Sequence, residues 1–305
     1  MRRLLLAAVM LGTVSAAHAA DMPDLPILRG SVTDGLSRAS HNWDGFYVGG
    51  QVGYTSSQVD FGHAPKSMTN FMLRNSVLQD PVSQWSLLPK NHVQANGFGA
   101  FVGRNWQWYD AVLGIEANYN YMNKLASAAS DSMSLAIVNP SGETPPAGHT
   151  YTYNTTLSGG AALQIKDIVT FRGRVGWDGG DFMPYAFAGL AVGRADVSRS
   201  ATVSWTKLDD YDRTTQTLVG FTGAGVPIYT TTTTHQTDNL GSNTQTQTER
   251  RTNSFLTGWT GGIGLEYAVW DCLFLRAEWE HIGFSNVKDI SVSLDNFRVG
   301  AGYKF

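Results

Sequence analysis

The stretch Asn296-Phe-Arg-Val-Gly-Ala-Gly-Tyr-Lys-Phe305 decides how the rest of this chain is read. Its odd-numbered residues are apolar or aromatic, and its even-numbered residues are polar, charged or glycine. Such strict alternation is typical of a β-strand with two unlike faces. In a soluble domain a bare apolar strand of this kind would pair with other chains. A strand that closes a barrel in a membrane has no free edge, so the stretch predicts a membrane barrel if the chain supplies the other strands.

The same alternation recurs seven times upstream. Each segment is close to the roughly 9–11 residues that a tilted spanning strand needs, which predicts an all-β, eight-stranded antiparallel, transmembrane up-and-down β-barrel. Barrel closure should pair the first of these strands with residues 296–305. Two strands, 96–106 and 183–195, carry small residues on both parities, so their outward faces stay open. The seven further segments are 45–54, 96–106, 112–121, 169–177, 183–195, 258–267 and 273–280.

The connections between these strands alternate between short and long. Short periplasmic turns and long extracellular loops are the pattern of outer-membrane barrels. Alternation in the fourth strand extends upstream through Leu157, Leu163 and Ile165, which predicts a hairpin projecting above the membrane, and Asp167 breaks the apolar parity. The Thr-rich third loop is either a flexible surface loop or a pair of β-hairpin extensions. The tight turns are 107–110, 178–181 and 269–271, the long extracellular loops are about 55–95, 123–156 and 196–254, and the last loop, 285–293, is short.

The N-terminal residues predict export. Arg2 and Arg3 precede an apolar run, and Ala17-His18-Ala19 is a small-x-small cleavage site, as in a secretory signal peptide over residues 1–19. No later stretch approaches the roughly 18 apolar residues of a spanning helix. We therefore expect residues 20–42 to form a periplasmic segment without a fold, residues 43–305 to form the barrel, and the protein to reside in the cell outer membrane.

Charged residues within the clearest strands share the inward parity. An eight-stranded barrel encloses a lumen that side chains can just fill, and unpaired charges there would be strongly unfavourable. These residues therefore predict a structural ion network that plugs the lumen. A narrow gated path for ions or small solutes, as in a porin, is the alternative. The nine residues of the predicted network are Glu116, Arg172, Arg174, Glu266, Arg276, Glu278, Glu280, Arg298 and Lys304.

Aromatic residues gather at the two ends of the predicted strands. Two aromatic girdles around an apolar band are typical of lipid-facing barrel walls, and both Trp43 and Tyr185 fall in the girdle beside the short turns. A soluble β-sandwich, the alternative fold, would bury its aromatic residues in mid-strand.

Several of these segments carry a family resemblance. The chain resembles the small outer-membrane barrel, porin-like surface-antigen family of alphaproteobacteria, and the general type of the OmpA transmembrane domain. The resemblance implies a surface-exposed outer-membrane protein in contact with lipid and lipopolysaccharide. Phe305 is similar to the terminal signal that the barrel-assembly machinery recognises. The matching segments are Trp43–Tyr54, Arg172–Trp177, Pro184-Tyr185, Gly189–Gly193, Gly258–Tyr267 and Gly300–Phe305.

Candidate sites for chemistry are weak, and we predict no catalytic residue, no metal and no cofactor. An enzyme at the outer rim could use His281 with Ser285 and Asp289, but a triad needs geometry that sequence cannot show, and no Gly-x-Ser-x-Gly elbow occurs. A formal net charge of −3 gives no support for a nucleic-acid partner. The loops could still bind an extracellular ligand. Surface capture of haem or metal would depend on scattered loop histidines without metal-ligand spacing, namely His63, His92, His149 and His235.

Overall fold

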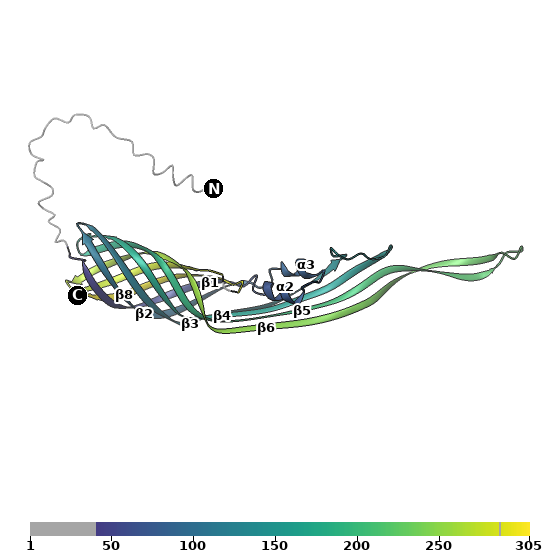
Figure 1. Cartoon of the computed structure of the whole chain (residues 1–305), viewed down its shortest axis with the longest axis horizontal. Coiled ribbons are helices and arrows are strands. Elements are labelled where there is room, and N and C mark those ends of the chain that lie inside the picture. Colours follow the sequence, from purple (N-terminus) through teal and green to yellow (C-terminus); the bar gives the residue numbers. More distant parts are fainter. Residues whose placement is uncertain (1–40, 287) are drawn as a thin grey trace, which may run out of the picture. The chain divides into compact units, whose positions relative to one another are not determined.

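The computed structural model describes residues 41–286 and 288–305, and these form a closed barrel of eight antiparallel strands (Figure 1). The predicted strand number and closure are confirmed, because β1 pairs with β8 in a register that places Val52 opposite Val299. The predicted signal peptide and residues 20–40 lie outside the described residues. The strands are β1 (Gly45–Asp60), β2 (Lys90–Trp108), β3 (Ala111–Val138), β4 (His149–Trp177), β5 (Phe182–Phe221), β6 (Pro227–Trp270), β7 (Leu273–Phe284) and β8 (Ser291–Lys304).

The structure assigns the faces of the two strands that the sequence left open. In β2, Phe98 points outward and is 60% exposed, whereas Phe101 points into the barrel and is 2% exposed. In β5, Leu190 points outward and Phe187 lies inside. The outer wall is thus a continuous apolar surface, as a barrel in hydrocarbon requires.

Two of the predicted long loops are paired strands over most of their length. Within 196–254 the β-hairpin alternative is confirmed, because β5 and β6 continue as a hairpin until Phe221 pairs with Pro227. Within 123–156, β3 and β4 continue until Val138 pairs with Thr152. Alternating Thr and Ser residues favour this outcome, since β-branched and hydroxyl side chains pair across strands, as Thr202 and Thr246 do at 2.9 Å. The hairpins extend well beyond the barrel (Figure 1).

Bulges at one height reverse the faces of β3, β4 and β6, whereas β5 keeps one inward parity through the same height. The ladder between β3 and β4 shifts between Tyr121 and Leu125, and the ladder between β4 and β5 shifts between Ile165 and Asp167. Tyr121 is 40% exposed on the outer wall, whereas Leu125 is 3% exposed on the inner face. In β6 the bulge includes Asn253, whose φ is +54°. An odd number of extra residues turns the apolar side of a strand over, so apolar side chains face lipid below the bulges and a protein core above them. We call this height the rim.

The first long connection, 55–95, also differs from a simple loop. β1 continues to Asp60 and β2 begins at Lys90, with helices α2 (Lys66–Met72) and α3 (Gln79–Ser83) between them. Neither helix, nor any other in the described part of the chain, has the length and hydropathy to cross a bilayer. The segment packs against the inner faces of the projecting strands and the barrel mouth. The apolar core that it joins includes Phe61, Leu78, Val82, Leu87, Leu157, Leu163, Ile165 and Val197.

Candidate functional site: a filled barrel lumen

Every strand of the barrel contributes a side chain to the middle of the lumen. Eight of these side chains are charged and are no more than 5% exposed, and we call them the charge layer. They are four carboxylates and four guanidiniums, so the layer is formally neutral. Its members are Glu116 of β3, Arg172 and Arg174 of β4, Glu266 of β6, Arg276, Glu278 and Glu280 of β7, and Arg298 of β8.

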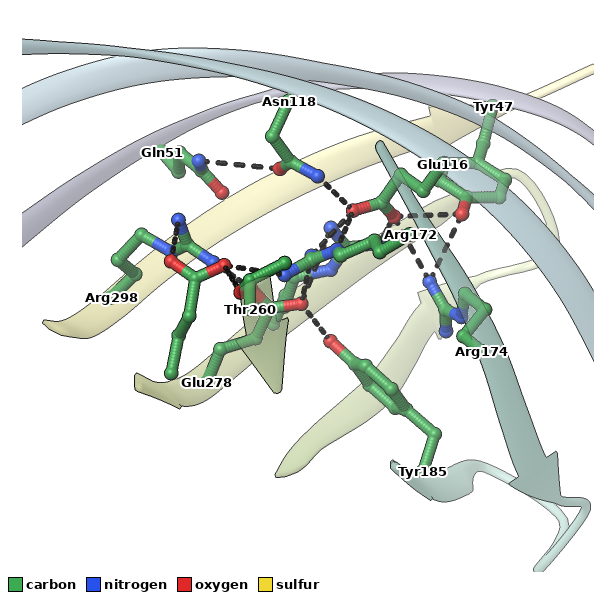
Figure 2. Close-up of polar contacts among 12 residues, drawn as sticks. Tyr47, Gln51, Glu116, Asn118, Arg172, Arg174, Tyr185, Thr260, Glu278 and Arg298 are labelled. Carbon is green, nitrogen blue, oxygen red and sulfur yellow. Dashed lines mark hydrogen bonds and ion pairs between the residues drawn. The ribbon is translucent and has the colours of Figure 1, made fainter. Parts of the chain in front are cut away.

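Glu116 lies at the centre of the charge layer, where three guanidiniums meet its carboxylate (Figure 2). Arg172 donates from Nε at 2.9 Å, and Arg276 donates from Nη2 at 2.7 Å. Arg174 donates from Nη1 at 3.2 Å. The Tyr47 hydroxyl and the Asn118 amide each donate at 2.7 Å. Such dense donation compensates the desolvation of a buried carboxylate.

Glu278 and Glu280 hold the other side of the charge layer. Arg298 bridges them: its Nη2 lies 2.8 Å from the Glu278 carboxylate, and its Nη1 lies 2.8 Å from the Glu280 carboxylate. Glu278 also accepts from the Tyr185 hydroxyl at 2.5 Å, and Glu280 from Thr260 at 2.8 Å. The four strands β5, β6, β7 and β8 are therefore tied together through two carboxylates (Figure 2).

Glu266 completes the charge layer. It accepts from Arg276 through Nε at 2.9 Å and forms an ion pair with Arg174, whose Nη1 lies 2.8 Å away. Arg174 lies 4.0 Å over the Tyr185 ring, and Arg276 lies 3.8 Å over the Phe101 ring. Stacking on the ring faces stabilises the guanidinium planes where no carboxylate reaches them.

Inward-facing glycines make room for the inward-facing rings. A Cβ on Gly103 would lie 2.3 Å from the Tyr47 hydroxyl, and a Cβ on Gly264 would lie 2.4 Å from the Tyr185 ring. Parity did not assign the Tyr185 ring, because small residues lie on both parities of its strand. Tyr185 and Trp43 therefore correct the predicted girdle, since they are 5% and 2% exposed inside the barrel.

The charge layer is closed on both sides. Toward the short turns lies an apolar floor that includes Trp43, Val112, Met183 and Phe274. Toward the rim lies an amide layer, in which Gln51 donates to Asn120 at 2.6 Å. Beyond it lies an apolar layer formed by Met122, Ile168, Leu256, Ile282 and Leu294. Polar and apolar side chains thus fill the lumen in successive layers.

Two predicted residues at the C-terminal end of β8 lie apart from the charge layer. The Lys304 amine contacts the carbonyl oxygen of Asn42, and no ion pair joins it to a carboxylate of the described residues, so its place in the network was wrong. It is too near the strand end to reach the others. Phe305 donates its N–H to the Phe46 carbonyl at 2.8 Å and stays 75% exposed, with its ring against Tyr303. Its role as an assembly signal remains a prediction.

A second charged cluster lies beyond the rim, and we call it the rim clamp. Arg199 of β5 binds Glu249 of β6 at 2.7 Å and donates to the carbonyl of Ala64 at 3.1 Å. It also lies 3.3 Å from Asp289, and Lys288 binds Glu249 at 2.8 Å. Hydrogen bonds from Lys288 and then Arg199 lower the pKa of Glu249 to about 2. The clamp joins the projecting hairpin to the first and last connections, and the charge pattern of the strands did not reveal it.

The structure does not assemble the rim triad that was considered from sequence. His281 binds Asp295 at 2.9 Å, whereas Asp289 belongs to the rim clamp. The backbone of Ser285 donates to Thr257. The loop histidines are also separate, since His149 binds Asp209, and the described residues contain no cluster of three potential metal ligands.

A closed barrel with an apolar outer wall and a lumen filled by paired charges defines the class of outer-membrane β-barrel proteins. The chain belongs to the family described as outer membrane protein beta-barrel domain, whose family model matches residues 4–305. Its location is accordingly the outer membrane.

Relatives of the chain are also outer-membrane proteins. A 22 kDa outer membrane protein of Rhizobium leguminosarum bv. viciae is 27% identical over 191 residues, which span 62% of this chain and 58% of that protein. Among solved structures, Ail, the attachment invasion locus protein of Yersinia pestis, is 12% identical with a TM-score of 0.33, covering 86% of this chain and 99% of that chain. Neisserial surface protein A is 14% identical with a TM-score of 0.31, covering 86% and 98%.

Proposed function

We propose that this protein is a non-conducting outer-membrane barrel that stabilises the envelope and displays a long β-sheet outside the cell. One observation carries the proposal: all eight charges of the charge layer are paired inside the lumen. A water-filled pore would leave such groups solvated and mobile. Here they are dry and mutually bonded, and Arg172, Arg174 and Arg276 also stack on aromatic rings, as a structural core requires.

The layers of the lumen lie in series, which argues against a porin. An ion crossing the barrel would have to displace the apolar floor, the charge layer, the amide layer and the apolar layer. Planar-bilayer recording of refolded protein is the direct test. We expect no stable unitary steps, and reproducible steps would refute the proposal and favour the narrow channel.

The proposed orientation places the short turns in the periplasm and the projecting hairpins outside. Cys272 lies in the short turn between β6 and β7, and it is the only cysteine of the chain. Gly223 lies at the far end of the β5–β6 hairpin, where a Cβ meets nothing within 4 Å. In intact cells a membrane-impermeant maleimide should label C272S/G223C and leave Cys272 of the native chain unlabelled until the outer membrane is permeabilised. The reverse pattern would overturn the orientation.

The proposed partners follow from this placement. Lipopolysaccharide and lipid would cover the outer wall, and the barrel-assembly machinery would recognise the closing strand through Phe305. An extracellular ligand would meet the projecting sheet. The proposal includes no catalytic step, because no serine of the described residues bonds to the His281–Asp295 pair.

A further inference from the structure

The tip of the β5–β6 hairpin is an exposed apolar surface with no described partner. Beyond Tyr211, which pairs with His149, β4 ends and the hairpin continues as a two-stranded ribbon. The ribbon ends in large apolar side chains that are between 44% and 63% exposed. We call this surface the apolar tip, and its members are Leu218, Val219, Phe221, Val226, Ile228 and Tyr229.

We propose that the apolar tip inserts shallowly into the lipid bilayer of an apposed membrane. The inference rests on the proposed function, in which this hairpin faces outward. An exposed patch of this kind marks an interaction site, and the question is which partner fits it.

The distribution of the side chains favours a lipid surface. Ile228 and Tyr229 are successive residues of one strand and therefore point to opposite faces of the ribbon, and both are exposed. A groove on a folded partner would cover one face, whereas hydrocarbon surrounds both. Residues 214–234 contain no charged side chain, so no ionic group enters with the tip.

The turn pairs three of its backbone N–H groups within itself, which lowers the cost of leaving water. Thr222 donates its N–H to the Val226 carbonyl at 2.8 Å, and Gly225 donates to the Thr222 carbonyl at 2.8 Å. Val226 donates in turn to the Thr222 hydroxyl at 3.1 Å. Unsatisfied backbone groups are what excludes most irregular turns from hydrocarbon. The outer edges of the ribbon remain unpaired, so insertion must stop near the headgroups.

The ribbon also carries charged residues that would limit the depth of insertion, and it is long enough to reach an apposed membrane. Charged residues return at Asp212 and Arg213 on one strand, and His235 pairs with Asp212 at 3.2 Å across the ribbon. This charged girdle would remain in water. From the rim at Asp196 to the tip at Phe221 the strand extends roughly 80 Å at about 3.3 Å per residue. That length would carry the tip clear of the cell's own bilayer.

The test uses the full chain. C272S/G223C would be labelled with the environment-sensitive fluorophore NBD, inserted into nanodiscs and mixed with protein-free phosphatidylcholine vesicles that contain nitroxide-labelled lipid. We expect the NBD emission to shift to shorter wavelength and to be quenched more by shallow than by deep nitroxides. A label at C272S/T232C, on the Thr-rich shaft, should not respond. Nanodiscs expose both ends of the barrel, so this result does not depend on orientation in cells.

The matched variant L218S/F221S/I228S should reduce vesicle partitioning by at least about tenfold, since each substitution removes exposed apolar area from the tip. Its barrel should still show the heat-dependent gel shift of the parent. Three results would overturn the proposal: no response at Gly223 in folded protein, equal partitioning by the variant, or an emission change that depends on protein concentration without vesicles. The last would identify a second copy of the chain as the partner. Failure here with correct surface labelling would leave the proposed function intact.

Discussion

Replacing Glu116 by Gln should destabilise the barrel more than any other single neutralisation in the charge layer. Its carboxylate accepts from three guanidiniums, a tyrosine and an amide, and its side chain is fully buried. Gln keeps the size and one acceptor oxygen, but it removes the negative charge. Four guanidiniums would then share three carboxylates in a dry lumen.

The expected cost follows from the burial of the cations that remain. Removing one partner of a buried ion pair costs about 3–5 kcal/mol, because it leaves an uncompensated charge. The amide of E116Q can still accept one of the Arg172 or Arg276 hydrogen bonds, so we expect about 3 kcal/mol. This loss should appear as a lower free energy of unfolding with an unchanged dependence on urea.

The assay is urea titration of protein refolded into vesicles, followed by the shift in gel migration between folded and unfolded forms. Asp131→Asn is the matched control, because Asp131 lies on the same strand, loses the same charge and is exposed. D131N should stay within about 0.5 kcal/mol of the parent. If E116Q behaved like D131N, the lumen would be wetter and less paired than the structure indicates.

A second substitution tests whether charge balance is the cause. R174M removes one guanidinium from the E116Q lumen and restores equal numbers of both signs. We expect the double variant to be less destabilised than the sum of the single variants, with a coupling energy of about 1–3 kcal/mol. Additive losses would indicate that packing, rather than charge, dominates.

Two further predictions concern the fit of the lumen and the rim clamp. Gly264→Ala should lower the free energy of unfolding by about 1–3 kcal/mol in the same urea assay, because its Cβ would lie 2.4 Å from the Tyr185 ring. Gly173→Ala is the control and should be neutral, since nothing lies within 4 Å of its Cβ. Equal effects of the two substitutions would contradict the fit between ring and glycine. Glu249 has a folded-state pKa of about 2, below its ordinary value of 4.5, so its contribution is present above about pH 4.5 and is lost as the pH falls toward 2. Because the Glu249 side chain is 25% exposed, its contribution to the free energy of unfolding should be about 1 kcal/mol. Limited proteolysis of the residues beyond the rim should increase at low pH in the parent and should depend less on pH in E249Q. Identical pH profiles of proteolysis for the parent and E249Q would refute a stabilising role of Glu249 in the rim clamp.

The barrel could be predicted because successive side chains of a barrel strand alternate between lipid and lumen. A strand between lipid and a packed lumen must alternate, so Phe297 and Val299 point out while Arg298 points in. The same parity predicts the inward position of all eight charged residues of the charge layer. Parity gives no height along the strand, however, which is why Lys304 was assigned to a network that it does not reach.

The remaining errors arose where glycine hides the pattern. β2 and β5 mix glycine with large residues, so parity alone did not show that Tyr185 and Phe101 fill the lumen. The signal that could have found them is the pairing of a ring on one strand with glycine on the next, as with Tyr185 and Gly264. α2 and α3 were missed because each is short and stabilised by the core above the barrel rather than by its own sequence.

The rim explains why one uninterrupted parity in β4 serves two environments. Leu163 and Ile165 share their parity with Val169 and Phe171, yet the first pair faces a protein core and the second faces lipid. A straight strand leaving the membrane would carry its lipid-facing side chains into water. The bulge between Ile165 and Asp167 turns that side inward, where the segment with α2 and α3 covers it. The reversal gives the projecting sheet a core of its own, and the apolar tip, which has no such cover, is therefore the exception in need of a partner.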